Sequence, residues 1–188
     1  MNKTIINLAK AFAGESQARN RYTVYAKIAK KEGLEEISAN FELTADQETE
    51  HAKWLMRLIN DLKKDDKVLE IEADVPTIIG TTKENLRAAI DGENHEHTSM
   101  YPEFADTADE ESLPEIANRL RAIAKAEANH EGRFQRFLTN LENETAFKKE
   151  TGVEWQCRKC GYRHTGKEAI VECPSCGHPQ AYFEVIRK

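Results

Sequence analysis

The stretch that decides the fold is residues 116–141, IANRLRAIAKAEANHEGRFQRFLTNL. Taken at alternating steps of four and three residues, it presents one helix face: Ile116, Leu120, Ile123, Glu127, His130, Phe134, Phe137 and Leu141. The face is apolar, as in a bundle helix, except for Glu127 and His130 in its middle. Burying a carboxylate and an imidazole costs on the order of several kcal/mol unless something compensates them. A bound cation would do so, and a lone buried ion pair is the simpler alternative.

The same pattern occurs in residues 34–63, which weakens the lone-ion-pair interpretation. This stretch also predicts a helix, and its inner face is Ile37, Phe41, Thr44, Glu48, His51, Leu55, Leu58 and Leu62. Glu48 and His51 occupy the two positions that Glu127 and His130 occupy in the first stretch. Two helices therefore carry the same pair of buried, charge-bearing side chains.

A further helix is expected from the start of the chain to about Lys31, with Gly33 as its stop signal. Glu15 and Tyr22 fall on or beside its inner face. Another is expected over about residues 82–109, where Thr81-x-x-Glu84 forms a capping box.

Glu93 and Glu96 lie on the inner face of that helix, and Pro102 predicts a kink or local irregularity within it. Ser112-x-x-Glu115 predicts a second capping box, which would open the helix that ends near Glu144. Residues 64–81 break the helical pattern and predict a long crossing connection with a little extended structure. Two helical hairpins joined by a crossover predict a bundle of the ferritin-like type.

The spacing of the acidic and histidine side chains places them in one layer. Glu15, Glu48 and His51 lie 18, 15 and 18 residues from Gly33. At about 1.5 Å rise per residue, they share a height roughly 25 Å from that turn. In the other hairpin, the corresponding residues lie 15 to 19 positions from Glu111: Glu93, Glu96, Glu127 and His130. The halves repeat at 78 positions for Glu15 and Glu93, and at 79 for Glu48 and Glu127.

Such a layer favours a pair of bridged cations, because many carboxylates need more than one positive charge. Carboxylates with imidazoles suit iron or manganese better than zinc. Di-iron and di-manganese carboxylate bundles use one Glu from each of two helices and Glu-x-x-His from each of the other two. This set matches that template: Glu15, Glu93, Glu48-x-x-His51 and Glu127-x-x-His130. Glu96 is one carboxylate beyond it. Tyr22 and Tyr101 could be simple core residues or could hydrogen-bond near the metals.

The carboxy-terminal part is predicted to be a separate metal-bound module, giving domains at residues 1–145 and 146–188, with a polar linker over residues 145–150. It contains two Cys-x-x-Cys-Gly knuckles, built from Cys157, Cys160, Cys173 and Cys176. A module this small has too little core to fold without a metal. Cysteine spacing alone favours structural zinc, whereas a di-metal oxidant that needs electrons favours iron.

Bulk composition limits the functions further. The formal net charge of −6 argues against nucleic acid as the main partner. The sequence has no apolar run of membrane-spanning length and its start does not resemble a signal peptide. These features predict a cytoplasmic location, where four cysteines favour metal ligation over disulfides.

With these motifs the chain resembles the rubrerythrin family, whose members have a ferritin-like di-iron bundle followed by a small β-rich, rubredoxin-like domain. The resemblance rests on Gly14-Glu15 with Tyr22, Glu48-x-x-His51, Gly92-Glu93-x-x-Glu96, Glu127-x-x-His130 and the two knuckles. It implies a peroxidase that reduces hydrogen peroxide to water, with two irons in the bundle and one at the cysteines. It also implies that Glu96 and His51 exchange as ligands of one iron on reduction.

The resemblance further implies a homodimer, in which helices can be exchanged and electrons pass between subunits. No Gly-x-Gly-x-x-Gly motif is present, so a separate NAD(P)H-dependent reductase or a rubredoxin is the expected donor. Three alternatives remain open: a ferroxidase or iron-handling protein, a di-manganese catalase, and a non-enzymatic scaffold with structural zinc.

Overall fold

The computed structural model describes residues 3–64 and 67–186. Residues 1, 2, 65, 66, 187 and 188, which fall in the expected domains and connection, lie outside the described residues. The helical elements are α1 (Lys3–Lys31), α2 (Glu35–Leu62), α3 (Thr82–His95), the π-helical segment η1 (Glu96–Met100), α4 (Tyr101–Glu110) and α5 (Pro114–Glu142). The carboxy-terminal elements are β1 (Lys148–Cys157), β2 (Arg163–Glu168), the short 3-10 helix η2 (Gln180–Tyr182) and β3 (Phe183–Val185).

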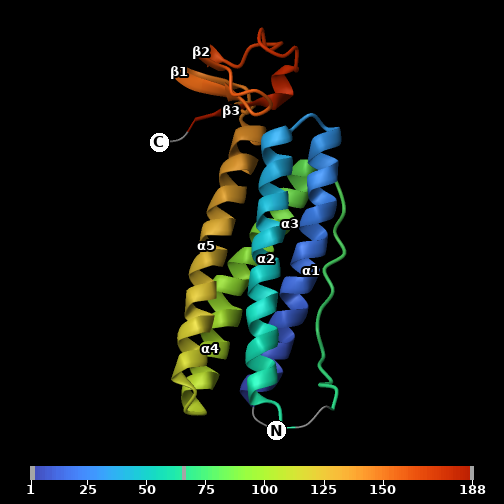
Figure 1. Cartoon of the computed structure of the whole chain (residues 1–188), viewed down its shortest axis with the longest axis vertical. Helices are drawn as coiled ribbons and strands as arrows, with labels where there is room; N and C mark the ends of the chain where they lie inside the picture. The colour runs from blue at the N-terminus through green and yellow to red at the C-terminus, as the bar shows by residue number, and fades with distance from the viewer. Residues whose placement is uncertain (1–2, 65–66, 187–188) are drawn as a thin grey trace.

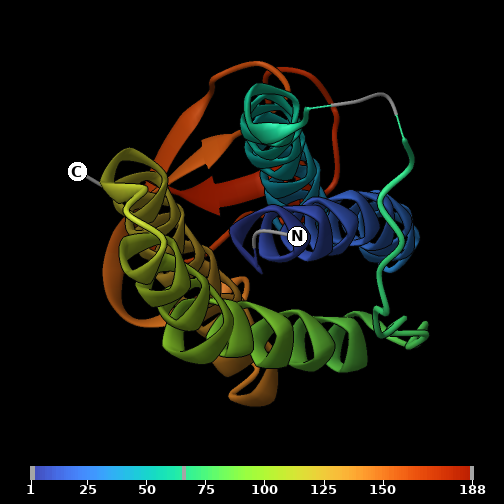
Figure 2. The same cartoon turned by 90° about the horizontal axis from the view of Figure 1, so that it is seen from below.

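The helices form the expected bundle, with α3, η1 and α4 following one another as one long, irregular rod (Figure 1). Residues 67–81, which precede α3, run along the outside of α1 (Figures 1 and 2). They contain neither helix nor strand. The Tyr25 hydroxyl donates a 2.7 Å hydrogen bond to the carbonyl of Ile78 and so fastens this connection to α1.

The turns inside the two hairpins have the same construction. Gly33 has φ +75°, and its N–H bonds to Lys30 while the next N–H bonds to Ala29, which is a Schellman motif. Ser112, 79 positions later, has φ +61° and ends α4 with the same pair of bonds. Because Ser112 closes α4, it is not the N-cap of α5. The capping box predicted at Ser112-x-x-Glu115 is therefore wrong, and Leu113 occupies the N-cap without a side-chain hydrogen bond.

The irregularity predicted from Pro102 is present as η1. Pro102 has no N–H to donate, so an uninterrupted α-helix would leave a carbonyl one turn earlier without its partner. The chain widens before that point, and the N–H of Tyr101 bonds to the carbonyl of Glu96, five residues back. The capping box predicted at Thr81 is confirmed, with both of its reciprocal bonds formed.

The bundle core has two apolar clusters, one on each side of a polar layer. One cluster includes Leu8, Leu55 and Leu120. The other includes the ring group of Tyr22, Phe41 and Phe134, whose ring centroids lie 5.0–5.8 Å apart. The acidic and histidine side chains lie between the clusters, so packing above and below holds them. None of the helices in the described part of the chain has both the length and the apolar character needed to cross a membrane.

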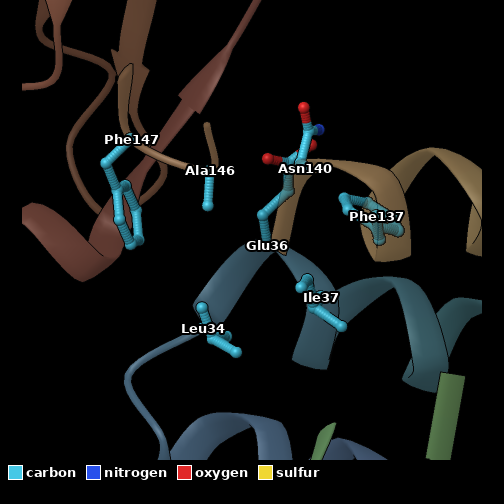
Figure 3. Close-up of a pocket in the computed structure, with 7 residues that line it drawn as sticks. All are labelled: Leu34, Glu36, Ile37, Phe137, Asn140, Ala146 and Phe147. Carbon is cyan, nitrogen blue, oxygen red and sulfur yellow. The ribbon is translucent and has the colours of Figure 1, made fainter. Parts of the chain in front are cut away.

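The small carboxy-terminal module sits at the end of the bundle where α1 turns into α2 (Figure 1). Its antiparallel sheet has the order β2-β1-β3, and buried Trp155 and Phe183 form its core with half-buried Tyr162 against them. β1 begins at Lys148, so the stretch predicted as a polar linker is partly strand. Phe147 and Ala146 face Leu34 and the end of α5 across a cavity of about 20 Å³ (Figure 3).

Candidate metal centres

The acidic layer brings the predicted residues together from four elements. α1 contributes Glu15, α3 contributes Glu93, and α2 and α5 each contribute one Glu-x-x-His pair. These side chains form two overlapping groups whose potential ligand atoms lie within 4.8 Å of one another: Glu15, Glu48, His51 and Glu127, then Glu48, Glu93, Glu127 and His130. Glu48 and Glu127 belong to both groups. The structure thus offers two adjacent cation positions with two carboxylates between them.

Each imidazole faces three carboxylates. His51 Nδ1 lies 2.9 Å from Glu127 Oε1, 3.0 Å from Glu48 Oε2 and 3.8 Å from Glu15 Oε1. His130 Nδ1 lies 2.8 Å from Glu127 Oε2, 3.0 Å from Glu48 Oε1 and 3.5 Å from Glu93 Oε2. A single N–H cannot satisfy three acceptors, whereas a cation in the same place would contact all of them.

Several buried carboxylates of the layer have strongly shifted pKa values, and bound cations would compensate their charge. Burial raises the pKa of Glu93 to about 7. Burial also raises the pKa of Glu15, and its acidic neighbours Glu127 and Glu48 add to the effect. Although burial opposes it, hydrogen bonding with His130 and His51 lowers the pKa of Glu48 to about 2. The two histidines cannot neutralise every carboxylate in the layer, so some of the carboxyl groups favour their protonated form.

Several of the buried polar atoms in this layer lack a hydrogen bond of good geometry. These atoms are Glu15 Oε2, Glu48 Oε1, Glu93 Oε2, both Glu127 carboxylate oxygens and His130 Nδ1. Leaving one such atom unsatisfied costs about 1–3 kcal/mol. The donors are carboxylate oxygens and imidazole nitrogens, which suit iron and manganese. The residues therefore fit a di-iron site, which is the cofactor that the family resemblance implies.

Tyr22 and Tyr101 are fully buried and both reach the layer. Tyr22 Oη donates a 2.5 Å hydrogen bond to Glu93 Oε1, and Tyr101 Oη donates one to Glu15 Oε1. Burial, together with the adjacent acidic groups, raises the pKa of both phenols, so they stay protonated donors. Each tyrosine thus belongs to one half of the repeat and holds the glutamate of the other half.

Glu96 lies at the edge of the layer and belongs to neither four-residue group. It is half-buried on η1, and burial followed by repulsion from Glu15 and Glu93 raises its pKa. His51 lies inside the layer, with 16% of its side chain exposed. The structure therefore has His51 among the potential ligands and Glu96 beside them.

Arg133 is a charged neighbour that sequence reasoning missed. Its guanidinium is half-buried and donates to Gln47 Oε1 at 2.6 Å and to Thr44 Oγ1 at 3.3 Å. Burial lowers its pKa, while attraction to Glu93 and Glu48 opposes that shift. Its position three residues after His130 was a usable signal, because residues three apart share a helix face.

The cysteines form the second predicted site. Cys157 Sγ lies 3.8 Å from Cys176 Sγ, and Cys160 Sγ lies 3.7 Å from Cys173 Sγ. Four thiolates about 2.3 Å from one metal ion have S–S separations of roughly 3.8 Å in a tetrahedron. The thiols thus have the spacing of a tetrahedral metal site and are not joined in disulfides.

Both knuckles have the same backbone. The N–H of Gly161 bonds to the carbonyl of Cys157, and that of Gly177 bonds to Cys173, each at 2.8 Å. Both glycines have positive φ, +79° and +68°, which other residues adopt at a cost. A hydrogen bond from the Tyr162 backbone lowers the pKa of Cys160 to about 6, which favours its metal-binding thiolate.

Comparison with known proteins agrees with this architecture. Residues 7–138 match the family model described as Rubrerythrin, and residues 155–184 match the one described as Rubrerythrin, rubredoxin-like domain. A putative rubrerythrin of Methanocaldococcus jannaschii is 57% identical over 98% of this chain and 93% of its own length. The rubrerythrin of Porphyromonas gingivalis is 51% identical over 99% of this chain and 91% of its own.

A solved structure of nigerythrin in its mixed-valence state has a TM-score of 0.65 and 29% identity, over 97% of this chain and 86% of that one. Taken together, the family matches, the carboxylate–histidine layer and the four-cysteine cluster place this chain in the rubrerythrin family.

Proposed function

We propose that this protein is a non-haem di-iron peroxidase that reduces hydrogen peroxide to water. The observation that carries the proposal is that one chain combines a two-cation carboxylate layer with a four-cysteine cluster. Zinc or iron would complete the cysteine site structurally, but a di-metal site in the same chain that must be supplied with electrons favours redox-active iron.

The proposal assigns each residue of the layer a place. Glu15 and His51 would hold one iron, Glu93 and His130 would hold the other, and Glu48 and Glu127 would bridge them. Bound as a ferrous pair, the metals would supply the two electrons for H2O2 + 2 H+ + 2 e− → 2 H2O. Tyr22 and Tyr101 keep Glu93 and Glu15 in place through the hydrogen bonds described above. The cysteine ligands Cys157, Cys160, Cys173 and Cys176 would hold the third iron.

Glu96 and His51 are proposed to alternate as a ligand of one iron, as family resemblance implies. The positions support this, because His51 lies inside the layer and Glu96 lies at its edge. A layer with one carboxylate more than the template could accommodate two ligand arrangements without a change of fold.

Electron delivery is proposed to come from a second subunit. Glu48 lies 15 residues below the α1–α2 turn, which is roughly 22 Å along the helix axis. The cysteine module lies beyond that turn in the same chain (Figure 1). Electron tunnelling falls steeply with distance, so a head-to-tail homodimer would shorten the path. A rubredoxin or an NAD(P)H-dependent reductase in the cytoplasm would then supply the electrons.

Metal analysis combined with donor-linked turnover tests the proposal. If the proposal is correct, the protein contains about three irons per chain, has a thiolate-to-iron absorption band, and oxidises its electron donor only when peroxide is present. Iron in the bundle with zinc at the cysteines, and no peroxide-dependent turnover, would favour the ferroxidase or iron-handling alternative. Evolution of dioxygen from peroxide without any donor would favour the di-manganese catalase.

A further inference from the structure

A cleft lies between α1, the rod formed by α3, η1 and α4, and the crossover connection. Its volume is about 370 Å³. α1 contributes Gly14 to its wall, and the opposite rod contributes Gly92 and Glu96. The crossover contributes residues around Asp74 and Pro76. The cleft therefore opens from solvent onto the α1–α3 side of the acidic layer.

Three glycines lie inside helices in the described part of the chain, Gly14, Gly92 and Gly132, and two of them, Gly14 and Gly92, line the cleft. Glycine weakens a helix interior relative to alanine, and neither residue has the positive φ that would require it. A Cβ on Gly92 would meet no atom within 4 Å, and one on Gly14 would meet only Glu96 Oε1, at 4.0 Å. Backbone geometry and crowding thus do not account for these glycines. Their common property is that a side chain at either position would project into the cleft.

The cleft borders the layer through Glu96 and through the two glycines that adjoin Glu15 and Glu93 in the sequence. Gly14 precedes Glu15 and Gly92 precedes Glu93, and both glutamates are 1% exposed. Glu96, which also lines the cleft, is half-buried. The cleft thus ends next to two potential ligands, Glu15 and Glu93, that are buried in the structure.

We propose that this cleft is the route by which small uncharged molecules reach the carboxylate–histidine layer, and that Gly14 and Gly92 keep it open. Its lining includes both signs of charge, with Lys10 and Arg21 opposed by Glu72, Asp74, Glu96 and Glu103, and this excess of acidic groups disfavours the entry of anions. That lining suits a neutral solute. The identity of the solute as hydrogen peroxide rests on the proposed function.

Nitric oxide is a suitable probe, because it is small and neutral, binds ferrous iron and needs no peroxidase chemistry. The experiment compares the full-length, iron-loaded and reduced protein with Gly92→Leu, by stopped-flow absorbance of nitric oxide binding. Gly132→Leu is the matched control, since Gly132 is also helical, has no atom within 4 Å of a built Cβ, and is exposed on α5. Iron content and the spectrum at saturation are measured for each variant.

We expect Gly92→Leu to slow the bimolecular rate constant roughly tenfold or more, because a steric barrier to entry adds to the activation free energy. Gly132→Leu should match the unmodified protein. If Gly92→Leu does not retain iron, Gly92→Ala replaces it, with a smaller slowing expected. An unchanged rate in an iron-loaded Gly92 variant overturns the proposal and points to entry past His51, a residue of α2 whose side chain is partly exposed.

Peroxide oxidation of the same samples separates this inference from the proposed function. Slower nitric oxide binding together with no peroxide oxidation of any sample would keep the route and reject the peroxidase. Unchanged nitric oxide binding with rapid peroxide oxidation would keep the peroxidase and reject the route.

Discussion

Tyr22 on α1 donates a 2.5 Å hydrogen bond to Glu93 on α3, although the two residues are 71 positions apart. Tyr101 makes the reciprocal bond from the second half of the chain to Glu15. Each bond joins the two hairpins across the acidic layer. These bonds therefore connect the stability of the bundle with the placement of its proposed metal ligands.

Tyr22→Phe should lower the metal affinity of the cation position that contains Glu93. It should leave the affinity of the position that contains Glu15 unchanged. The loss of one bond to a buried carboxylate should also lower the unfolding free energy of the metal-free chain by about 1–3 kcal/mol. Manganese titration of the metal-free protein reports the two stepwise affinities of the bundle without filling the cysteine site, because manganese prefers oxygen ligands to thiolates. Tyr101→Phe should show the opposite preference.

The control for both variants is Tyr25→Phe, which removes a buried hydroxyl that bonds to the crossover carbonyl of Ile78. It should lower stability without changing manganese affinity. Equal weakening of both cation positions by Tyr22→Phe would contradict the assignment of Glu93 to one position.

Glu48→Gln should abolish binding at both cation positions, whereas Glu93→Gln should affect one. Glu48 belongs to both groups of potential ligands and Glu93 to a single group. Metal analysis after dialysis against iron or manganese checks the difference. Glu50→Gln is the control, because Glu50 is exposed and pairs with Lys53 on the outside of α2. Retention of one metal by Glu48→Gln would show that Glu48 does not bridge.

Cys160→Ser should stop donor-linked turnover and leave the bundle folded. Cys160 belongs to the sulfur cluster of the carboxy-terminal module, which has a core of its own. Circular dichroism and the metal content of the bundle test the fold, and a donor oxidation assay tests the electron route. Full turnover in this variant would mean that electrons enter the bundle without passing through the cysteines.

Ser112→Gly should raise the unfolding free energy by about 0.5 kcal/mol, because Ser112 has φ +61° and glycine adopts this conformation without strain. The opposite exchange at the matching turn, Gly33→Ser, should lower it by about 1 kcal/mol. Chemical denaturation of both variants measures the two changes. Stabilisation by Gly33→Ser would argue against the αL assignment of that turn.

Glu111→Gln should remove a pH-dependent contribution to stability. Hydrogen bonds from the Thr4 side chain, and from the backbone of Thr4 and Lys3, lower the pKa of Glu111 in the folded state. Its stabilising effect is therefore complete above the usual glutamate pKa and is lost as the pH falls through the lowered value. Thermal unfolding of both proteins over this acidic range should show the curves converging towards low pH. A constant difference at every pH would contradict this origin.

Residue patterns predicted the layer well because burial has a simple period. Glu48, His51, Glu127 and His130 stood out as polar residues on otherwise apolar helix faces, and the structure places them together. The cysteine knuckles could also be predicted from the sequence, because the Cys-x-x-Cys-Gly motif fixes the local backbone.

Other features depend on contacts that no period encodes. The sharing of Glu48 and Glu127 between two cation positions follows from the helix crossing geometry. Ser112 was predicted as an N-cap because serine favours that role. In the structure it instead ends α4, in a left-handed conformation that an N-cap residue does not have. The start of β1 at Lys148 depends on pairing with Glu168, which a local polar composition does not reveal.

The π-helical segment has a consequence for how the two hairpins relate. Glu15 and Glu93 are 78 positions apart, but Tyr22 and Tyr101 are 79 apart, so one extra residue lies between Glu93 and Tyr101. η1 occupies this interval and absorbs that residue without turning Tyr101 away from the layer. The residue equivalent to Glu96 in the first hairpin is Ala18, which has no ligand atom. The two halves of an apparent tandem duplication thus differ by one inserted residue and by the carboxylate of Glu96, and that carboxylate lines the cleft.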